Sequence, residues 1–100
     1  MRPLKFFLDT HDRRSNTFPN GLSSEQFAEF FAKYEKACRE HGVVVLRTHV
    51  GIDAGRAYCF NMAESAEQVK RAHEAVGLAF ETITEVTTAT PADLSFEPEL

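Results

Sequence analysis

The chain has 100 residues, of which 43% are hydrophobic and 26% are charged, a composition typical of one folded domain. Eleven Lys and Arg residues against fifteen Asp and Glu residues leave a formal net charge of −4, with no basic stripe that could neutralise phosphates, so we expect no nucleic acid partner. No segment approaches the roughly 18 apolar residues of a membrane span, and the start, MRPLKFFLDTHD, lacks a signal-peptide core. We therefore expect a cytoplasmic protein that binds no membrane and keeps its two cysteines reduced.

The first predicted element is a strand near the N-terminus. Two sets of residues alternate from Leu4 to Asp9, which is the period of two of a strand with one face on the core. Leu4, Phe6 and Leu8 form the side expected to face the core, whereas His11 continues the side of Asp9. The polar stretch DRRSNTFPNG then predicts a loop, because it combines Pro with Asn-Gly.

A helix is predicted to follow this loop. Ser23 and Gln26 have the spacing of a capping box, in which each side chain bonds the other residue's backbone N–H. Gly42 marks the end of the helix, since Gly is the usual residue just past a helix terminus. Cys38 lies on the apolar stripe between these signals and is expected to fill the core.

A hairpin of two strands comes next, VVVLRTHV (43–50) and RAYCFNMA (56–63). A three-residue loop with Gly55 in the left-handed conformation gathers the bulky side chains on one face. In this register His49 lies directly across from Cys59, and both lie on the face opposite to the bulky side chains. A two-residue loop would mix the bulky and polar sets, so we prefer the three-residue loop.

The last part of the chain predicts a second helix and a final strand. Ser65 and Gln68 form another capping box, and the helix that they open runs to about Val76. LAFETITEVTTA, residues 78–89, is rich in Thr, Val, Ile and Phe and predicts a strand. PADLSFEPEL, residues 91–100, is an acidic tail with two prolines.

The order strand, helix, strand, strand, helix, strand predicts a single α+β domain over residues 1–90. This is the ferredoxin-like βαββαβ sandwich, a four-stranded antiparallel sheet with two helices on one face. The other face then carries Phe7 and Val45 among polar groups. A sheet face of this kind is seldom fully exposed to solvent. We expect a second copy to cover it, which predicts a homodimer.

The candidate functional residues are mainly histidines, because the sequence lacks phosphate-binding, zinc-protease and nucleophile-elbow motifs. Imidazole suits nickel, zinc and copper, and a carboxylate or thiol nearby adds an oxygen or sulfur donor. Two of the histidines lie near strand ends and a third is one turn from the end of the second helix. The predicted metal ligands are His11, His49, His73, Cys59 and Asp9.

Each candidate also has a structural interpretation. An inward histidine such as His73 is commonly a core ring that bonds a backbone carbonyl, and His11 and His49 fit strand ends in solvent. Cys59 fits a small buried hydrophobe. The residues alone leave these alternatives open.

Residues 43–86, nearly half of the chain, resemble a family of short bacterial domains of formerly unknown function, one branch of which is nickel-binding. The matching stretches are GRAYCF, AHEAVGL and ITEV. The resemblance implies the ferredoxin-like fold, a dimer and the uptake of nickel. It also points to His73, inside AHEAVGL, as part of a site.

Two functions from different classes follow, and a plain interaction domain is a third. The first is a dimeric module that binds nickel(II) or another divalent transition metal for buffering or sensing, without catalysis. Its affinity should fall below about pH 6.5, because binding requires neutral imidazoles. The second is a dimeric α+β-barrel enzyme of the monooxygenase type or a small-molecule-binding domain. There the open sheet face forms a pocket in which His49, Tyr58 or Arg47 orients a ligand or moves a proton.

Overall fold

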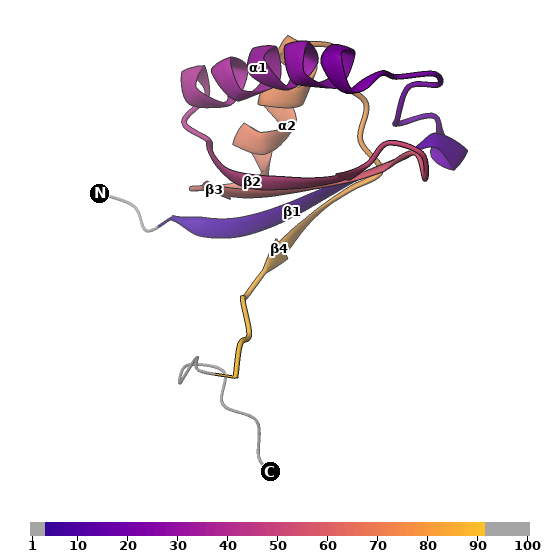
Figure 1. Cartoon of the computed structure of the whole chain (residues 1–100). Coiled ribbons are helices and arrows are strands. Elements are labelled where there is room, and N and C mark those ends of the chain that lie inside the picture. The colour runs from indigo at the N-terminus through magenta and orange to yellow at the C-terminus, as the bar shows by residue number, and fades with distance from the viewer. Residues whose placement is uncertain (1–3, 92–100) are drawn as a thin grey trace.

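The computed structural model describes residues 4–91, which form a sandwich of one sheet and two helices (Figure 1). The elements in chain order are β1 (Lys5–Asp12), a 3-10 turn (Arg13–Ser15), α1 (Ser24–Glu40), β2 (Val44–Gly51), β3 (Arg56–Ala63), α2 (Ala66–Ala75) and β4 (Thr82–Val86). This order confirms the predicted ferredoxin-like α+β fold.

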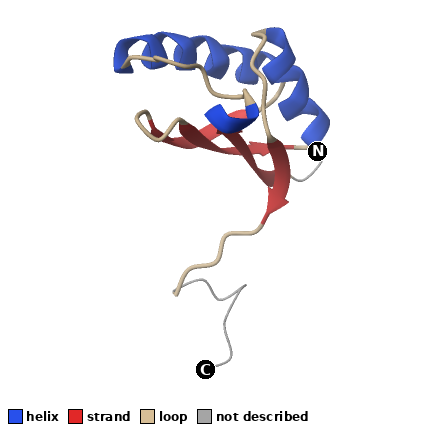
Figure 2. Cartoon of the chain, turned by 90° about the vertical axis from the view of Figure 1, so that its right-hand side faces the viewer, coloured by secondary structure: helices blue, strands red, loops and turns tan. Residues whose placement is uncertain are grey.

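The sheet has four antiparallel strands in the order β2-β3-β1-β4, so β1 and β3 lie in its centre. Both helices lie on one face of the sheet, as the two perpendicular views agree (Figures 1 and 2). Within residues 4–91, no helix covers the other face, which we call the open face. The side chains of each strand therefore point either into the helix layer or onto the open face.

Both helices begin and end where the sequence signals predict. The Ser23 Oγ accepts a bond from the Gln26 N–H at 3.1 Å, and the Gln26 Oε1 accepts one from the Ser23 N–H at 2.9 Å. Gly42 and Gly77 follow the two helices with φ of +76° and +66°, a conformation that glycine adopts without steric cost. The caps thus fix where each helix begins and ends.

The hairpin between β2 and β3 differs from the predicted register by one residue. Gly51 pairs with Arg56, so the loop between them contains one residue more than the predicted three. Gly55 has the predicted left-handed conformation, with φ of +69°, but a Cβ there would lie 2.7 Å from the Arg13 side chain. The four-residue loop therefore packs closely against the Arg13 side chain.

The shift reverses the faces of β2. His49 pairs with Tyr58 on the open face, and Thr48 pairs with Cys59 on the helix side. The prediction that His49 faces Cys59 is therefore wrong, because a shift of one residue moves every side chain of a strand to the opposite face. An irregularity between Val45 and Arg47 changes the alternation again further along β2.

The two sides of β1 are also the reverse of the prediction. Phe7, Asp9 and His11 are buried on the helix side, whereas Leu4 and Phe6 remain 46% and 37% exposed. Hydrophobic alternation suggested the opposite, because it could not reveal that Asp9 and His11 bond partners from the helix layer.

Val45, also predicted on the open face, packs against the core. The buried core consists of Phe7, Tyr34, Cys38, Val43, Cys59, Ala63, Val69 and Ala72.

The final strand is shorter than the predicted 78–89, since β4 is only Thr82–Val86. Residues 78–81 instead form a non-strand link from α2 to the sheet, and the Glu81 N–H bonds the Thr10 carbonyl at 2.7 Å. Of the predicted acidic tail, residues 92–100 lie outside the described part. Across residues 4–91, every helix is too short or too polar to cross a bilayer.

Candidate metal centre

Three buried side chains converge between the sheet and α2. Asp9 and His11 come from β1, two residues apart and therefore on the same face, and His73 comes from α2. Their exposed fractions are 0%, 4% and 0%, and one potential ligand atom of each lies within 4.8 Å of the other two. The fold thus joins residues that are more than 60 positions apart in the chain.

The two imidazole rings are fixed by backbone carbonyls. The His73 Nδ1 lies 2.7 Å from the Val69 carbonyl oxygen, one turn earlier in α2, and the His11 Nδ1 lies 2.8 Å from the Ala79 carbonyl oxygen. A carbonyl can only accept, so both Nδ1 atoms carry the proton and donate it. The Nε2 of each neutral ring is consequently a bare lone pair.

Aromatic contacts hold these rings in place. The His11 and His73 rings stack with their centroids 5.4 Å apart. The edges of Tyr34 and Phe80 meet His73, with centroid distances of 4.9 and 5.1 Å. Packing on three sides leaves His73 little freedom to turn its Nε2 elsewhere.

Both Nε2 atoms point at the same carboxylate oxygen. The Asp9 Oδ2 lies 2.7 Å from the His11 Nε2 and 3.0 Å from the His73 Nε2. The other oxygen, Oδ1, accepts a bond from the Asn61 amide at 2.6 Å and a longer one from the Tyr34 hydroxyl at 3.5 Å. Neutral donors therefore satisfy Oδ1, and the two imidazoles face Oδ2.

The surroundings favour the charged form of Asp9. Burial by itself raises the pKa of this carboxyl group. When the Nε2 atoms of His11 and His73 also carry protons, their hydrogen bonds and positive charge outweigh burial and leave the pKa below its usual range. Burial and the nearby Asp9 charge raise the pKa of the Tyr34 hydroxyl, which stays protonated and remains a donor. The cluster thus contains a stable negative charge at its centre.

Three lone pairs consequently meet at one point when the imidazoles are neutral. Lone pairs this close repel each other unless a positive charge, two protons or a metal cation, is shared among them. Histidines that bind metals commonly donate the other ring N–H to a carbonyl, as His11 and His73 do. Bonds of about 2.1 Å place neighbouring ligand atoms about 3 Å apart, close to the observed 2.7 and 3.0 Å. The residues therefore fit a divalent transition metal.

The remaining two predicted ligands do not join this group. Cys59 is buried and pairs with Asp9 across the sheet, yet its sulfur is not among the converging atoms. Burial and the Asp9 charge raise the pKa of this thiol, which disfavours the thiolate that metals bind. His49 is exposed on the open face, on the opposite side of the sheet from the cluster.

Sequence reasoning missed the supporting residues Tyr34, Asn61 and Phe80. Asn61 gave a signal, because it is a polar residue that shares its face of the strand with Cys59. The contribution of Phe80 left no signal, since residues 78–81 were predicted to continue a strand. The bond between the His11 ring and the Ala79 carbonyl could not be predicted from side-chain types, because it involves a backbone atom.

Taken together, the fold and the cluster define a small α+β sandwich domain with a buried pair of histidines around one carboxylate. Residues 7–86 match the model of the family described as nickel responsive protein SCO4226-like, and the chain belongs to this family. The matched range includes Asp9, His11 and His73.

One solved structure is similar over most of its length. It is the crystal structure of SCO4226 from Streptomyces coelicolor A3(2), which has 25% sequence identity and a TM-score of 0.71. The match covers 85% of this chain and 99% of that chain. No curated protein matches the sequence. The family found by comparison agrees with the resemblance noted in residues 43–86.

Proposed function

We propose that this protein binds a divalent transition metal, nickel(II) in the first place, through Asp9, His11 and His73, and that it does so without catalysis. Its role is to buffer the metal or to sense it. The nickel response in the family's description supports the choice of nickel. Three protein donors also leave coordination positions for water or another small ligand.

One observation carries the proposal: both Nδ1 atoms are committed to carbonyl oxygens, and this directs both Nε2 lone pairs at the Asp9 Oδ2. A structural core histidine needs only one such partner. Two buried rings held in the same tautomer around one carboxylate require a shared positive charge, and a metal ion supplies it without protonating either ring. The proposed ligand set therefore excludes His49 and Cys59.

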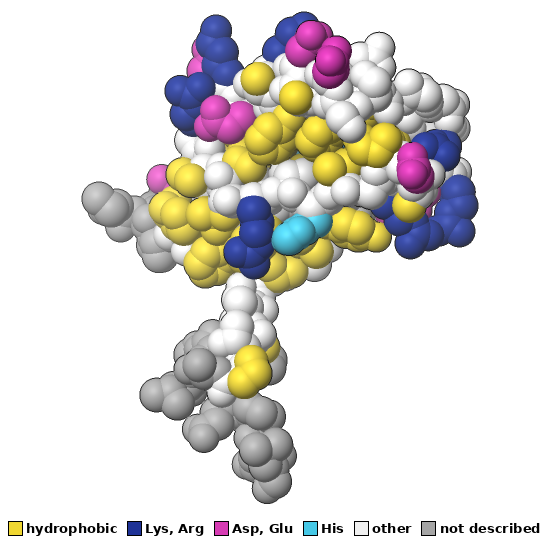
Figure 3. Space-filling model, viewed as in Figure 1, with side chains coloured by type: hydrophobic (Ala, Val, Ile, Leu, Met, Phe, Trp, Pro, Cys, Tyr) yellow, Lys and Arg dark blue, Asp and Glu magenta, His cyan; other side chains and the backbone are white. Residues whose placement is uncertain are grey.

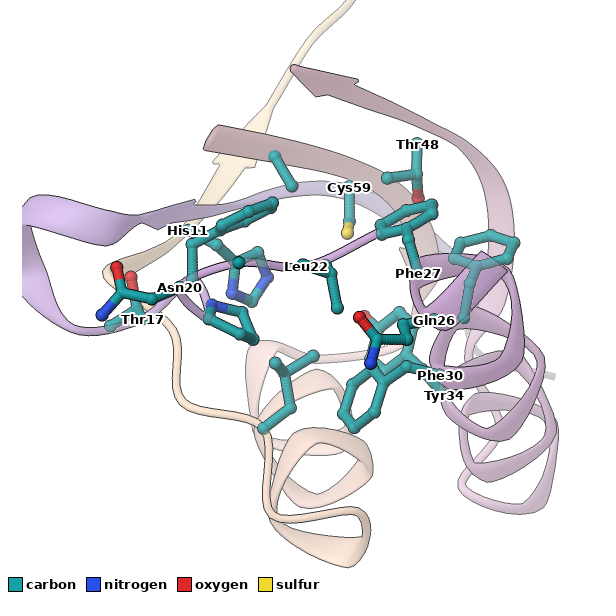
Figure 4. Close-up of a pocket in the computed structure, with 16 residues that line it drawn as sticks. His11, Thr17, Asn20, Leu22, Gln26, Phe27, Phe30, Tyr34, Thr48 and Cys59 are labelled. Atoms are coloured by element: carbon teal, nitrogen blue, oxygen red, sulfur yellow. The ribbon is translucent and has the colours of Figure 1, made fainter. Parts of the chain in front are cut away.

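The His11 edge of the cluster borders a cavity. This cavity has a volume of about 370 Å³ and lies between the helix layer and the sheet (Figure 4). We expect an ion to reach the ligand atoms from this edge. The cluster itself remains closed on the sides of Tyr34 and Phe80.

The open face supports a homodimer as the functional form. Large apolar side chains are exposed on it beside polar ones, and the Phe6 and Phe60 rings stack there at 5.5 Å. Figure 3 shows hydrophobic side chains gathered along the lower side of the sheet. An apolar surface of this kind commonly marks an interface, and a second copy related by a two-fold axis offers a matching surface. The large hydrophobic side chains exposed by 37% or more are Leu4, Phe6, Val44, Leu46 and Tyr58.

The direct test is a calorimetric titration of metal-free, untagged protein with nickel chloride. The wild type should bind one nickel ion per chain. His11→Gln and His73→Gln should each lose at least about 100-fold in affinity, more than the loss of a residue that merely orients a ligand. His49→Ala is the matched control, because this histidine lies on the opposite face of the same sheet.

Circular dichroism of each variant checks that the fold is retained. Equal affinity in the wild type, His11→Gln and His73→Gln would refute the proposed ligands. A loss confined to His49→Ala would place the nickel on the open face instead.

A further inference from the structure

The two oxygens of the Asp9 carboxylate meet different kinds of partner. Oδ2 faces the Nε2 atoms of His11 and His73, at 2.7 and 3.0 Å. Oδ1 accepts a short hydrogen bond from the Asn61 amide at 2.6 Å and a long one from the Tyr34 hydroxyl at 3.5 Å. Since a carboxylate oxygen has two lone pairs, these two donors use the acceptor positions of Oδ1.

The two donors to Oδ1 also bond each other. The Asn61 Nδ2 lies 3.3 Å from the Tyr34 hydroxyl oxygen, so Asp9, Asn61 and Tyr34 form a closed triangle of polar groups. The three side chains come from β1, β3 and α1, and none is more than 1% exposed. Bulk solvent therefore does not compete for Oδ1, and the surrounding elements fix its donors in place.

The Asn61 amide can serve Asp9 in one orientation only. The reverse orientation would place the amide oxygen beside a carboxylate oxygen, and two acceptors repel each other at this distance. In the observed orientation both contacts of Nδ2 are made, whereas the amide oxygen bonds no residue in the described range. The hydrogen bonding of this side chain is thus directed at Asp9 and Tyr34.

This arrangement bears on how Asp9 can bind a cation. A carboxylate binds a metal through one oxygen or through both, and binding through both requires a free lone pair on each. Large cations take many oxygen ligands at about 2.3–2.6 Å and use both modes. Smaller transition metals accept imidazole nitrogens and single carboxylate oxygens at about 2.0–2.2 Å. With Oδ1 in use, Asp9 can offer only Oδ2.

We propose that Asn61, together with Tyr34, is a positioning residue that restricts Asp9 to one metal-facing oxygen. The site thereby selects cations of the size of nickel over larger ones such as Cd²⁺. This inference rests on the proposed function, because it concerns the choice of ion at the same three ligands. Two nitrogen donors and one oxygen already suit nickel, whereas a larger cation gains from a second oxygen, and Oδ1 is the other oxygen of the same carboxylate.

The test compares nickel chloride with cadmium chloride in calorimetric titrations of the metal-free full chain. Asn61→Leu removes the amide donor at similar size, and Tyr34→Phe removes only the hydroxyl. Asn61→Leu should bind nickel about 10-fold more weakly, as expected for a residue that orients a ligand, and should bind cadmium as well as before or better. The ratio of nickel to cadmium affinity should therefore fall about 10-fold. Tyr34→Phe should lower this ratio by a smaller factor.

Thr48→Val is the matched control, because this residue lies on the same side of the sheet and its hydroxyl bonds none of the three ligands. It should keep the wild-type ratio. A residue that only supports the fold would weaken both metals alike, so the ratio separates positioning from stability.

Infrared difference spectra of metal-loaded minus metal-free protein report the binding mode directly. The two stretching bands of a carboxylate lie further apart when one oxygen binds a metal than when both do. The nickel-loaded wild type should show the wide separation, and cadmium-loaded Asn61→Leu should show the narrow one. Protein made with aspartate labelled with carbon-13 at the side-chain carboxyl group identifies the bands.

The outcomes separate this inference from the proposed function. An unchanged ratio in Asn61→Leu and Tyr34→Phe, or a narrow separation in the nickel-loaded wild type, would overturn the inference and leave the proposed ligands untouched. A wild type that binds no nickel would refute both. If circular dichroism shows that Asn61→Leu does not fold, the ratio in Tyr34→Phe decides the question.

Discussion

The two faces of the sheet have opposite characters, and each is unusual for its position. The side covered by helices contains a carboxylate and two histidines that are almost completely buried. The side that no described helix covers carries exposed large hydrophobic residues such as Phe6 and Tyr58. Burial of apolar residues and exposure of polar ones would place them the other way round, and this is why we propose that both faces bind a partner.

The difference also underlies our proposal of what each face binds. Buried charges are costly unless they are paired, and the Asp9 cluster is paired in a way that also suits a cation. Exposed apolar area is costly in water and is relieved by covering it. We therefore propose that the covered face binds a metal ion and that the open face binds a second copy of the chain.

The largest predicted effect comes from removing the carboxylate at the centre of the buried face. Asp9→Ala leaves two imidazole nitrogens without a partner and should lower the free energy of unfolding of the metal-free protein by about 3 kcal/mol. Asp9→Asn should cost less, because the amide can donate to an Nε2 lone pair, but it should still abolish nickel binding. Urea unfolding and nickel titration of both variants measure the two effects.

If Asp9→Asn retained wild-type nickel affinity, the carboxylate would not be a ligand. If Asp9→Ala were as stable as the wild type, the cluster would contribute little to the fold.

A smaller effect is expected when a charge is placed on the open face. Phe6→Lys should weaken the dimer by about 2–3 kcal/mol, or roughly 30- to 150-fold, because each partner loses an apolar contact and gains a charge. Sedimentation velocity should show dimers for the wild type and monomers for the variant at the same micromolar concentration. Lys5→Ala, at a polar exposed neighbour, serves as the control. A wild type that is monomeric throughout this range would contradict the assignment of the open face.

The smallest predicted effect concerns acid. Burial alone raises the pKa of Asp9, but the bonds and charge of His11 and His73 lower it below 3.8, so the folded state holds this proton less tightly than the unfolded state. The stabilisation is therefore fully present above pH 3.8 and is lost as the pH falls through the lowered value. Urea unfolding of the metal-free wild type between pH 5 and pH 2.5 should show this loss.

Asp9→Asn should lose the corresponding part of the pH dependence, at most about one proton. The same slope in the variant and the wild type would mean that other carboxyl groups cause the acid sensitivity.

The sequence predicted the fold because its strongest signals are local. Two capping boxes, Ser23 with Gln26 and Ser65 with Gln68, and the glycines at 42 and 77 are sufficient to delimit both helices. The order of elements then leaves few alternatives to a ferredoxin-like sandwich. None of these signals requires knowledge of which face of a strand is buried.

The faces could not be predicted in the same way. On β1 both alternating sets contain phenylalanine, and only the partners of Asp9, which come from α2 and β3, make its burial favourable. On β2 the outcome depended on one residue of loop length, which was enough to move His49 away from Cys59. The sequence therefore named Asp9, His11 and His73 as candidates but could not separate them from His49.

The most direct test of the central claim is a crystal structure of the nickel-loaded protein with data collected on both sides of the nickel absorption edge. The account predicts one anomalous peak per chain, about 2.1 Å from the Nε2 atoms of His11 and His73 and from a carboxylate oxygen of Asp9. A peak at His49 or elsewhere on the open face, with the buried cluster free of nickel, would contradict it.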